Sequence, residues 1–446
     1  MNTEIFKAYD IRGRVGTELT TEVAWKVGAA LADWLPEQGA VGVGYDMRPD
    51  SKNLAEALIE GLRLQGRKVI NIGNVSTDMI YFAVGFLKLA GGAMVTASHN
   101  PGDYNGIKLC REEAKPIGIE TGLANIRDEA AAGNFVPAAT KGELEERDLR
   151  EDWVNHVLGF VDVQHWPDYN IAIDAGNGML GVIAPVLEAK VPKLHVARMY
   201  YELDGTFPNH IANPLDPKNL IDLQKKVLDA GLDFGIAFDG DGDRAVLVDE
   251  NGEAVSGTVM TAILAKYFLQ KNPGATILFN AICGRIVPET IEANGGQAFR
   301  TKVGHSFIKA EMRRHEAVFA GEHSSHFYFK DNWCADSGLL AAMVAVQVLA
   351  DSGKKLSELA GEFKKYFSID ETNFEVQDKD AVIAKVKDTF SDGEQDELDG
   401  LTVRYETCWF NVRGSNTEPL LRLNAEASTK EELDQLVARV TGVIQA

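Results

Sequence analysis

The chain has little cysteine. Its four cysteines are widely spaced among 446 residues and form no CxxC pair; they are Cys110, Cys283, Cys334 and Cys408. This spacing argues against a disulfide framework and against a zinc site built from paired cysteines. A reducing cytoplasm is the simplest location for such a protein.

Long hydrophobic runs are missing as well. The longest, residues 338–350 with one Gln inside, is too short to span a bilayer and predicts a buried helix. The N-terminal sequence MNTEIFKAYD lacks the basic and apolar regions of a signal peptide. We therefore expect no membrane partner.

Positive charge is in deficit. The chain carries 45 Lys and Arg against 66 Asp and Glu, a formal net charge of −21. Because nucleic-acid phosphates need a basic surface, we expect no nucleic-acid partner. A small anionic substrate is compatible with this charge, since a few arginines and lysines can make one cleft locally positive.

The most informative stretch that is present reads DGDGDR, from Asp239 to Arg244. Three carboxylates this close repel one another unless a cation joins them, and an all-oxygen ligand set suits Mg²⁺. The glycines let the backbone turn tightly enough to aim the three side chains at one point. Arg244 adds a planar fork suited to phosphate, so the stretch predicts a site for phosphoryl groups.

Two other interpretations of this stretch compete. An EF-hand would place the three aspartates at loop positions one, three and five, with Glu250 at position twelve. However, Arg244 stands at position six, where the EF-hand needs Gly, and the flanking runs look like strands rather than helices. A plain acidic surface turn would explain Asp and Gly, but not their strict alternation after the apolar run at 234–238.

The motif TASHNP, residues 96–101, places Ser98 at the end of a predicted strand, where α/β folds carry their sites. No GxSxG elbow surrounds it, so an esterase-type triad is not indicated. A serine that faces a metal-carboxylate loop can instead hold a phosphoryl group. Lys108, in the following NGIK, can contact phosphate, or move a proton if nearby cations lower its pKa. The alternatives are an ordinary turn serine and a solvated loop lysine.

Two further motifs group polar side chains. GEHSSH, which ends at His326, combines a carboxylate, hydroxyls and imidazoles that match the hydroxyl groups of a sugar. Zinc ligation by Glu322, His323 and His326 is the alternative, although no HExxH motif or cysteine supports it. RGSNTEP, residues 413–419, clusters donors around a glycine and can form a nest for a phosphate dianion, or be an ordinary hairpin loop.

Helical and strand patterns alternate along most of the chain, for example helices at 21–34 and 51–65 around a strand at 40–46. This alternation predicts mainly parallel sheets with helices on both faces, and it restarts twice to give three similar α/β units. A smaller α+β domain follows, with a helix at 379–390, an acidic turn at 391–400, strands at 401–413 and 419–425, and a closing helix at 429–444. The expected domain limits are 1–145, 146–250, 251–367 and 368–446.

Together with YDIRG at 9–13, these motifs occur in one order across nearly the whole chain. In this the sequence resembles the α-D-phosphohexomutase superfamily, and within it the bacterial phosphomannomutase/phosphoglucomutase group. The resemblance implies a heart-shaped molecule with a central cleft, made of three related α/β domains and a smaller mobile C-terminal α+β lid. It also implies bound Mg²⁺, a resting enzyme phosphorylated on Ser98, and a hexose 1,6-bisphosphate as activator.

The resemblance further implies roles for individual residues. The metal would be held by Asp239, Asp241, Asp243 and a phosphate oxygen on Ser98, with Arg244 supporting this site and counted among the substrate-binding residues. Proton transfer and charge stabilisation would fall to Arg12, Lys108 and His305. Sugar hydroxyls would be read by Glu322, Ser324 and His326, and the phosphate that is not reacting would be held by Arg413, Ser415, Asn416 and Thr417.

The implied reaction is reversible transfer of phosphate between O1 and O6 of a hexose, through phosphoserine and a hexose 1,6-bisphosphate. Mannose phosphates are the expected substrates, together with glucose phosphates. His323 and Ser325 depart from the family pattern, which has Met and a Gly or Ala there, so the sugar preference is open. The alternatives are a phosphoglucosamine mutase, a metal-dependent sugar phosphatase and a non-catalytic sugar-phosphate-binding protein. The oligomeric state is also open, and a monomer is plausible.

Overall fold

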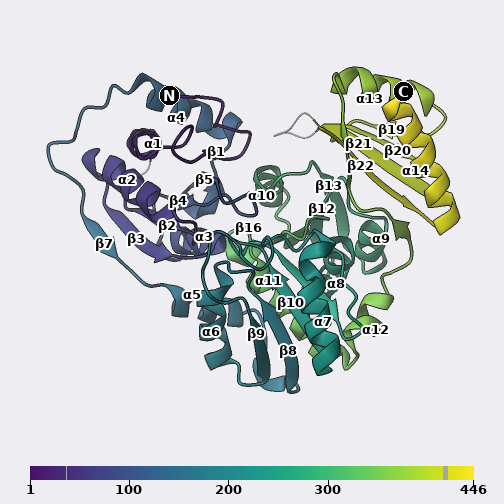
Figure 1. Ribbon diagram of the computed structural model, residues 1–446. Helices are drawn as coiled ribbons and strands as arrows, with labels where there is room; N and C mark the ends of the chain where they lie inside the picture. Colours follow the sequence, from purple (N-terminus) through teal and green to yellow (C-terminus); the bar gives the residue numbers. More distant parts are fainter. Residues whose placement is uncertain (37, 415–419) are drawn as a thin grey trace.

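The computed structural model describes residues 1–36, 38–414 and 420–446. Within these residues the strands form four sheets, which follow one another along the chain. Figure 1 shows the first and fourth units as separate lobes that stand on either side above the second and third. The arrangement of three α/β units and a smaller α+β unit is the one expected from the sequence.

The first sheet has the strand order β1-β5-β4-β2-β3-β7, with β6 beside β5. Its strands are β1 (Ile11–Arg14), β2 (Val41–Tyr45), β3 (Val69–Asn74), β4 (Gly91–Val95), β5 (Tyr104–Arg111), β6 (Lys115–Pro116) and β7 (Leu144–Glu146). Its helices are α1 (Thr21–Trp34), α2 (Ser51–Leu64), α3 (Thr77–Phe86) and α4 (Leu123–Ala132). The Thr20 side chain caps α1 by accepting from the N–H of Val23, as the sequence pattern predicts.

Pairing in this sheet is parallel among β4, β2, β3 and β7, but β5 runs antiparallel to both β1 and β4. The prediction of a mainly parallel sheet is therefore wrong at this edge. The reason is the short connection at 96–103, because a parallel pair needs a crossover of a dozen or more residues. This connection is the TASHNP loop, so antiparallel pairing brings the strand with NGIK beside the strand that precedes Ser98.

The second sheet has the order β11-β10-β8-β9. Its strands are β8 (Tyr169–Asp174), β9 (Leu194–Met199), β10 (Phe234–Phe238) and β11 (Ala245–Asp249), and its helices are α5 (Arg150–Leu158), α6 (Leu180–Lys190) and α7 (Ile221–Ala230). Every residue of β10 and β11 is buried. DGDGDR is the tight connection between these two antiparallel strands, which excludes the EF-hand interpretation because no helix flanks the loop.

The third sheet has the order β13-β12-β14-β15-β16. Its strands are β12 (Thr276–Asn280), β13 (Gln297–Thr301), β14 (Phe319–Gly321), β15 (Phe327–Phe329) and β16 (Ala335–Asp336). Its helices are α8 (Gly257–Lys271), α9 (Ile286–Ala293), α10 (His305–Arg314), α11 (Gly338–Ser352) and α12 (Leu356–Gly361). The apolar helix α11 is almost wholly buried, as predicted; Ser337 caps its start and Gly353 ends it in the left-handed conformation.

The fourth sheet has the order β17-β22-β21-β20-β19, with β18 beside β22, and among its described residues every strand pairing is antiparallel. Its strands are β17 (Phe367–Ser368), β18 (Thr372–Glu375), β19 (Glu394–Asp396), β20 (Leu401–Arg404), β21 (Cys408–Gly414) and β22 (Leu420–Ala427). Helices α13 (Lys379–Thr389) and α14 (Lys430–Gln445) belong to the same unit.

Two predictions in this unit are wrong in detail. The run 401–413 is two strands, because the chain turns back at Tyr405 and pairs β20 with β21. The acidic turn at 391–400 contains β19, which pairs with β20 at the sheet edge. A charged side-chain pattern is compatible with an edge strand, where it hinders pairing with other chains.

Short 3₁₀ helices connect some of these elements: η1 (Glu112–Ala114), η2 (Ile119–Thr121), η3 (Val163–His165), η4 (Pro217–Leu220) and η5 (Lys330–Asn332). Across the described residues, no helix combines the length and apolar character needed to cross a membrane.

Candidate active site

Ser98 lies just beyond β4 in an uncommon backbone conformation. The φ angle of Ser98 is +50°, in the left-handed region that a non-glycine residue seldom adopts, and Ser98 is only 5% exposed. The Ser98 N–H donates to Thr96 Oγ1 at 2.9 Å, and the Ser98 Oγ lies 3.1 Å from Oδ2 of Asp239. The strained turn therefore directs this hydroxyl at the acidic loop.

Arg48 fixes the loop that carries Ser98, and nothing in the sequence analysis pointed to it. Its buried guanidinium, which lies beside the buried Asp46 carboxylate, donates hydrogen bonds to main-chain carbonyl oxygens of that loop. The acceptors are the carbonyls of Ser98 (2.8 Å), Asn100 (2.5 Å), Pro101 (2.8 Å) and Tyr104 (2.9 Å). One side chain thus holds the strained loop at several points.

The acidic loop is buried, which contradicts the surface-turn interpretation. Asp239, Asp241 and Asp243 each offer a carboxylate oxygen within 4.8 Å of the others. Within the described part of the chain, Asp241 Oδ1 and Asp243 Oδ1 have no hydrogen-bond partner. Buried carboxylate oxygens that lack a hydrogen bond and lie at this spacing fit a hard cation, so this cluster can hold a metal ion.

The three carboxyl groups are not equivalent. Burial and the nearby Asp243 raise the pKa of Asp239 well above its usual range. Burial alone would also raise the pKa of Asp243, but Lys108, His326 and Arg244 together lower it well below its usual range. The proton affinity of each carboxyl group is therefore set by its burial and by the charges nearest to it.

Lys108 projects from β5 into this cluster. Its Nζ lies 2.8 Å from Asp241 Oδ2 and 2.8 Å from Asp243 Oδ2. Burial lowers the pKa of Lys108, but the two carboxylates outweigh burial and raise it well above its usual range. The condition under which we expected Lys108 to move a proton, a pKa lowered by neighbouring cations, is not met, because its nearest charges are anions.

Arg244 contacts the serine and the acidic loop together. Its Nε donates to Asp239 Oδ2 at 2.9 Å, and its Nη2 lies 3.4 Å from Ser98 Oγ and 2.6 Å from His99 Nδ1. Burial and Arg244 hold the pKa of His99 well below its usual range, which leaves the imidazole neutral and able to accept this bond. Arg244 therefore supplies positive charge directly beside the Ser98 hydroxyl.

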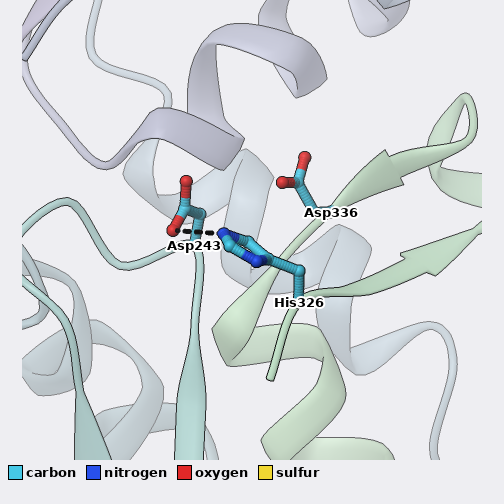
Figure 2. Close-up of side chains that lie close together, drawn as sticks. All are labelled: Asp243, His326 and Asp336. Carbon is cyan, nitrogen blue, oxygen red and sulfur yellow. Dashed lines mark ion pairs between the residues drawn. The ribbon is translucent and has the colours of Figure 1, made fainter. Parts of the chain in front are cut away.

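The loop between β14 and β15 contributes His326. Its Nε2 lies 3.5 Å from Asp243 Oδ1. Figure 2 draws this ion pair as a dashed line, with the Asp336 carboxylate close by. Its Nδ1 lies 3.1 Å from Ser324 Oγ, and a backbone bridge joins His326 to Arg244. The predicted sugar loop and the acidic loop are thus directly connected.

Glu322 and His323 lie differently from what a shared zinc site would require. Glu322 is buried and accepts hydrogen bonds from Asn280 Nδ2 at 3.0 Å and Tyr328 Oη at 2.5 Å. His323 Nδ1 is 3.0 Å from Thr258 Oγ1, and His323 lines a cavity of about 160 Å³ that fourth-sheet residues also line. Among the described residues no metal-ligand cluster includes His323, so the zinc alternative is not supported.

The remaining predicted residues lie around this centre or apart from it. Arg12 bonds Asn100 Oδ1 at 2.7 Å and pairs with Asp10 at 2.6 Å, next to the serine loop. His305 begins α10; burial and Lys309 lower its pKa to about 3. Arg413 lies on β21, in the separate upper lobe of Figure 1. Ser415, Asn416 and Thr417 lie outside the described residues.

Comparison with known proteins agrees with this geometry. Four families match the chain: phosphoglucomutase/phosphomannomutase α/β/α domain I over residues 3–136, domain II over 151–252, domain III over 256–366, and the C-terminal domain over 371–443. The chain belongs to the phosphoglucomutase/phosphomannomutase family. It is accordingly a phosphohexose mutase, an isomerase with a sugar-phosphate substrate.

Individual relatives cover nearly the whole chain. A protein from Xanthomonas campestris described as phosphohexose mutases is 42% identical, over 96% of this chain and 95% of its own length. A protein from Salmonella montevideo described as phosphomannomutase is 38% identical, over 100% of this chain and 99% of its own length. A solved phosphoglucomutase/phosphomannomutase family protein from Burkholderia thailandensis superposes with a TM-score of 0.91 at 31% identity, over 100% of this chain and 98% of that one. These matches extend the family assignment across all four units.

Proposed function

We propose that this enzyme moves phosphate between O1 and O6 of mannose, and also of glucose, and that Ser98 carries the phosphoryl group. The observation that carries the proposal is the Ser98 hydroxyl, 3.1 Å from Asp239 and 3.4 Å from Arg244. The third unit joins this cluster through His326, 3.5 Å from Asp243. The choice of mannose is supported by the relatives described as phosphomannomutase, from Salmonella and Escherichia coli.

In the proposed reaction the P–Oγ bond of phosphoserine breaks while a sugar hydroxyl oxygen forms a new bond to phosphorus. The sugar hydroxyl loses its proton and the leaving Ser98 Oγ takes one up, so no net proton is released. The resulting hexose 1,6-bisphosphate then reorients, so that its other phosphate faces Ser98. This phosphate is transferred to the Ser98 oxygen, and the sugar oxygen that carried it becomes a hydroxyl. Arg244 and Lys108 neutralise charge at the transferring group. Arg12 is, with Lys108, a proposed residue for charge stabilisation, and His305, whose lowered pKa leaves it neutral, is the proposed residue for proton transfer.

We propose Mg²⁺ as the cation of the acidic loop, held by Asp239, Asp241, Asp243 and a phosphate oxygen on Ser98. The bound ion would supply charge neutralisation of the phosphoryl oxygens. A hexose 1,6-bisphosphate is the proposed activator, because it can phosphorylate Ser98. Glu322, Ser324 and His326 are proposed to read the sugar hydroxyls, and Arg413, Ser415, Asn416 and Thr417 to hold the phosphate that is not reacting.

Two further proposals concern the molecule as a whole. We place domain boundaries near 145, 250 and 367; moving the first past Glu146 keeps β7 in the first unit. We propose a cytoplasmic location, which is compatible with four cysteines that are all free and buried.

The test is a comparison of sugar 1-phosphates. The purified enzyme, with Mg²⁺ and catalytic bisphosphate, should convert mannose 1-phosphate and glucose 1-phosphate to 6-phosphates, followed by ³¹P NMR, with mannose preferred. Glucosamine 1-phosphate should react much more slowly. Fastest turnover of glucosamine 1-phosphate would contradict the proposed sugar, and release of inorganic phosphate without a 6-phosphate would contradict the proposed reaction.

A further inference from the structure

Two arginines of the fourth sheet share one carboxylate. Arg413 on β21 and Arg422 on β22 are directly opposite each other in the strand register. Glu371 Oε2 lies 2.5 Å from Arg413 Nη2, and Glu371 Oε1 lies 3.0 Å from Arg422 Nη1. A two-oxygen anion held by two guanidinium groups is also the way in which arginines bind phosphate.

Glu371 belongs to the same sheet as the two arginines. It lies between β17 and β18, which both pair with β22, the strand that carries Arg422. Strand pairing within the fourth unit therefore holds the three side chains close together.

We propose that Glu371 occupies the Arg413 guanidinium as an internal substitute for phosphate, and that the sugar phosphate must displace it. This inference rests on the proposed function, in which Arg413 holds the phosphate that is not reacting. A phosphate dianion and the Glu371 carboxylate carry charge of the same sign and repel each other, so in this proposal they compete for Arg413 Nη2. Glu371 thereby weakens phosphate binding.

This exchange suits a reaction in which one phosphate must leave and the other must enter. When the bisphosphate dissociates from Arg413, the Glu371 carboxylate pairs with Arg413 again, so the buried guanidinium is not left unpaired. Release of the intermediate is then easier than from a site without a competing anion. Glu371 is in this view a residue that sets phosphate affinity and exchange, and it takes no part in the chemical step.

A different role for Glu371 predicts the opposite result. If Glu371 stays on Arg413 and orients it toward phosphate, removing its charge weakens binding. If Glu371 competes, removing its charge tightens binding. The sign of the change in affinity therefore decides between the two.

The experiment uses Glu371→Gln in the full chain, with glucose 1-phosphate as the probe in isothermal titration calorimetry. Loss of a partly exposed ion pair and of repulsion toward the phosphate should lower the dissociation constant by roughly three- to tenfold. Glu375→Gln is the matched control, because it removes the same charge from an exposed position on β18. The control should change the dissociation constant by less than about twofold.

Two more variants make the outcome unambiguous. Glu371→Asp keeps the charge but withdraws it by one methylene, and should give a smaller tightening; it replaces Glu371→Gln if that variant does not fold. Arg413→Ala tests the underlying function and should weaken binding. Weakened binding with Arg413→Ala but unchanged or weaker binding with Glu371→Gln overturns the inference alone. Unchanged binding with Arg413→Ala overturns the proposed role of Arg413, and the inference with it.

Discussion

Substitution of Arg48 by Lys is the sharpest test of how Ser98 is positioned. A lysine keeps the positive charge beside Asp46 but has one nitrogen, so it cannot replace the guanidinium bonds to Ser98, Asn100, Pro101 and Tyr104. Loss of about three such bonds, at about 1 kcal/mol each, should cost about 2–4 kcal/mol. The left-handed backbone of Ser98 would then relax.

We expect this cost to appear in catalysis, because the loop must be ordered for the hydroxyl to face Asp239. If the full amount, about 2–4 kcal/mol, is lost from the free energy that orders the Ser98 loop, kcat/KM for glucose 1-phosphate drops roughly 30- to 1000-fold. The assay is steady-state kinetics with catalytic bisphosphate, combined with urea unfolding of the same preparation. Unchanged kcat/KM in a folded Arg48→Lys protein would refute the positioning role.

Arg67→Lys is the matched control in the same unit. Arg67 is also buried and donates to main-chain carbonyls, those of Ala32 and Leu35, at 2.5–3.0 Å. These carbonyls lie at the end of α1 and not in the serine loop. The variant should lose stability to urea without losing kcat/KM.

Three further predictions concern other buried contacts. Asp241→Asn should weaken Mg²⁺ binding at least tenfold in a metal titration, because the acidic loop loses one charge; an unchanged titration would contradict the metal site. Burial opposes charge on His210, but Asp174 at 2.9 Å raises the pKa of His210 above its usual value. Protonated His210 therefore stabilises the fold below about pH 6.5, and this stability is lost as pH rises through the raised pKa. His210→Gln should flatten that dependence in urea unfolding, whereas an unchanged slope would exclude this pair. Lys309→Met should leave the buried Asp336 carboxylate, 2.6 Å away, unpaired and destabilise the protein by about 3–5 kcal/mol; a loss below about 1 kcal/mol would contradict this.

The sequence was sufficient for the parts of the fold that local pattern determines. The capped helix α1, the buried helix α11 and the strand before DGDGDR follow from capping, apolar runs and turn chemistry. The turn between β20 and β21 could not be predicted, because residues 405–407 read YET and contain no Gly, Pro, Asn or Asp. Only pairing with a distant part of the sheet determines where that run divides.

The candidate site shows the same limit. Residue types and spacing pointed to Ser98 and the acidic loop, because their chemistry is unusual within a short stretch. Arg48 and Glu371 could not be found in this way, since each acts on groups that are 42 or more positions away. The raised pKa of Lys108 has the same origin, because its carboxylate partners come from the second unit. Long-range contacts of single charged residues leave no periodic signal in a sequence.

The central claim is that Ser98 carries the phosphoryl group, and intact-protein mass spectrometry with turnover measurement tests it most directly. After incubation with hexose 1,6-bisphosphate, the wild-type protein should carry the mass of one phosphoryl group. Ser352→Ala, at the end of α11 and away from the site, should carry it too. Ser98→Ala should carry none and lose nearly all mutase activity, whereas a phosphorylated or active Ser98→Ala protein would contradict the claim.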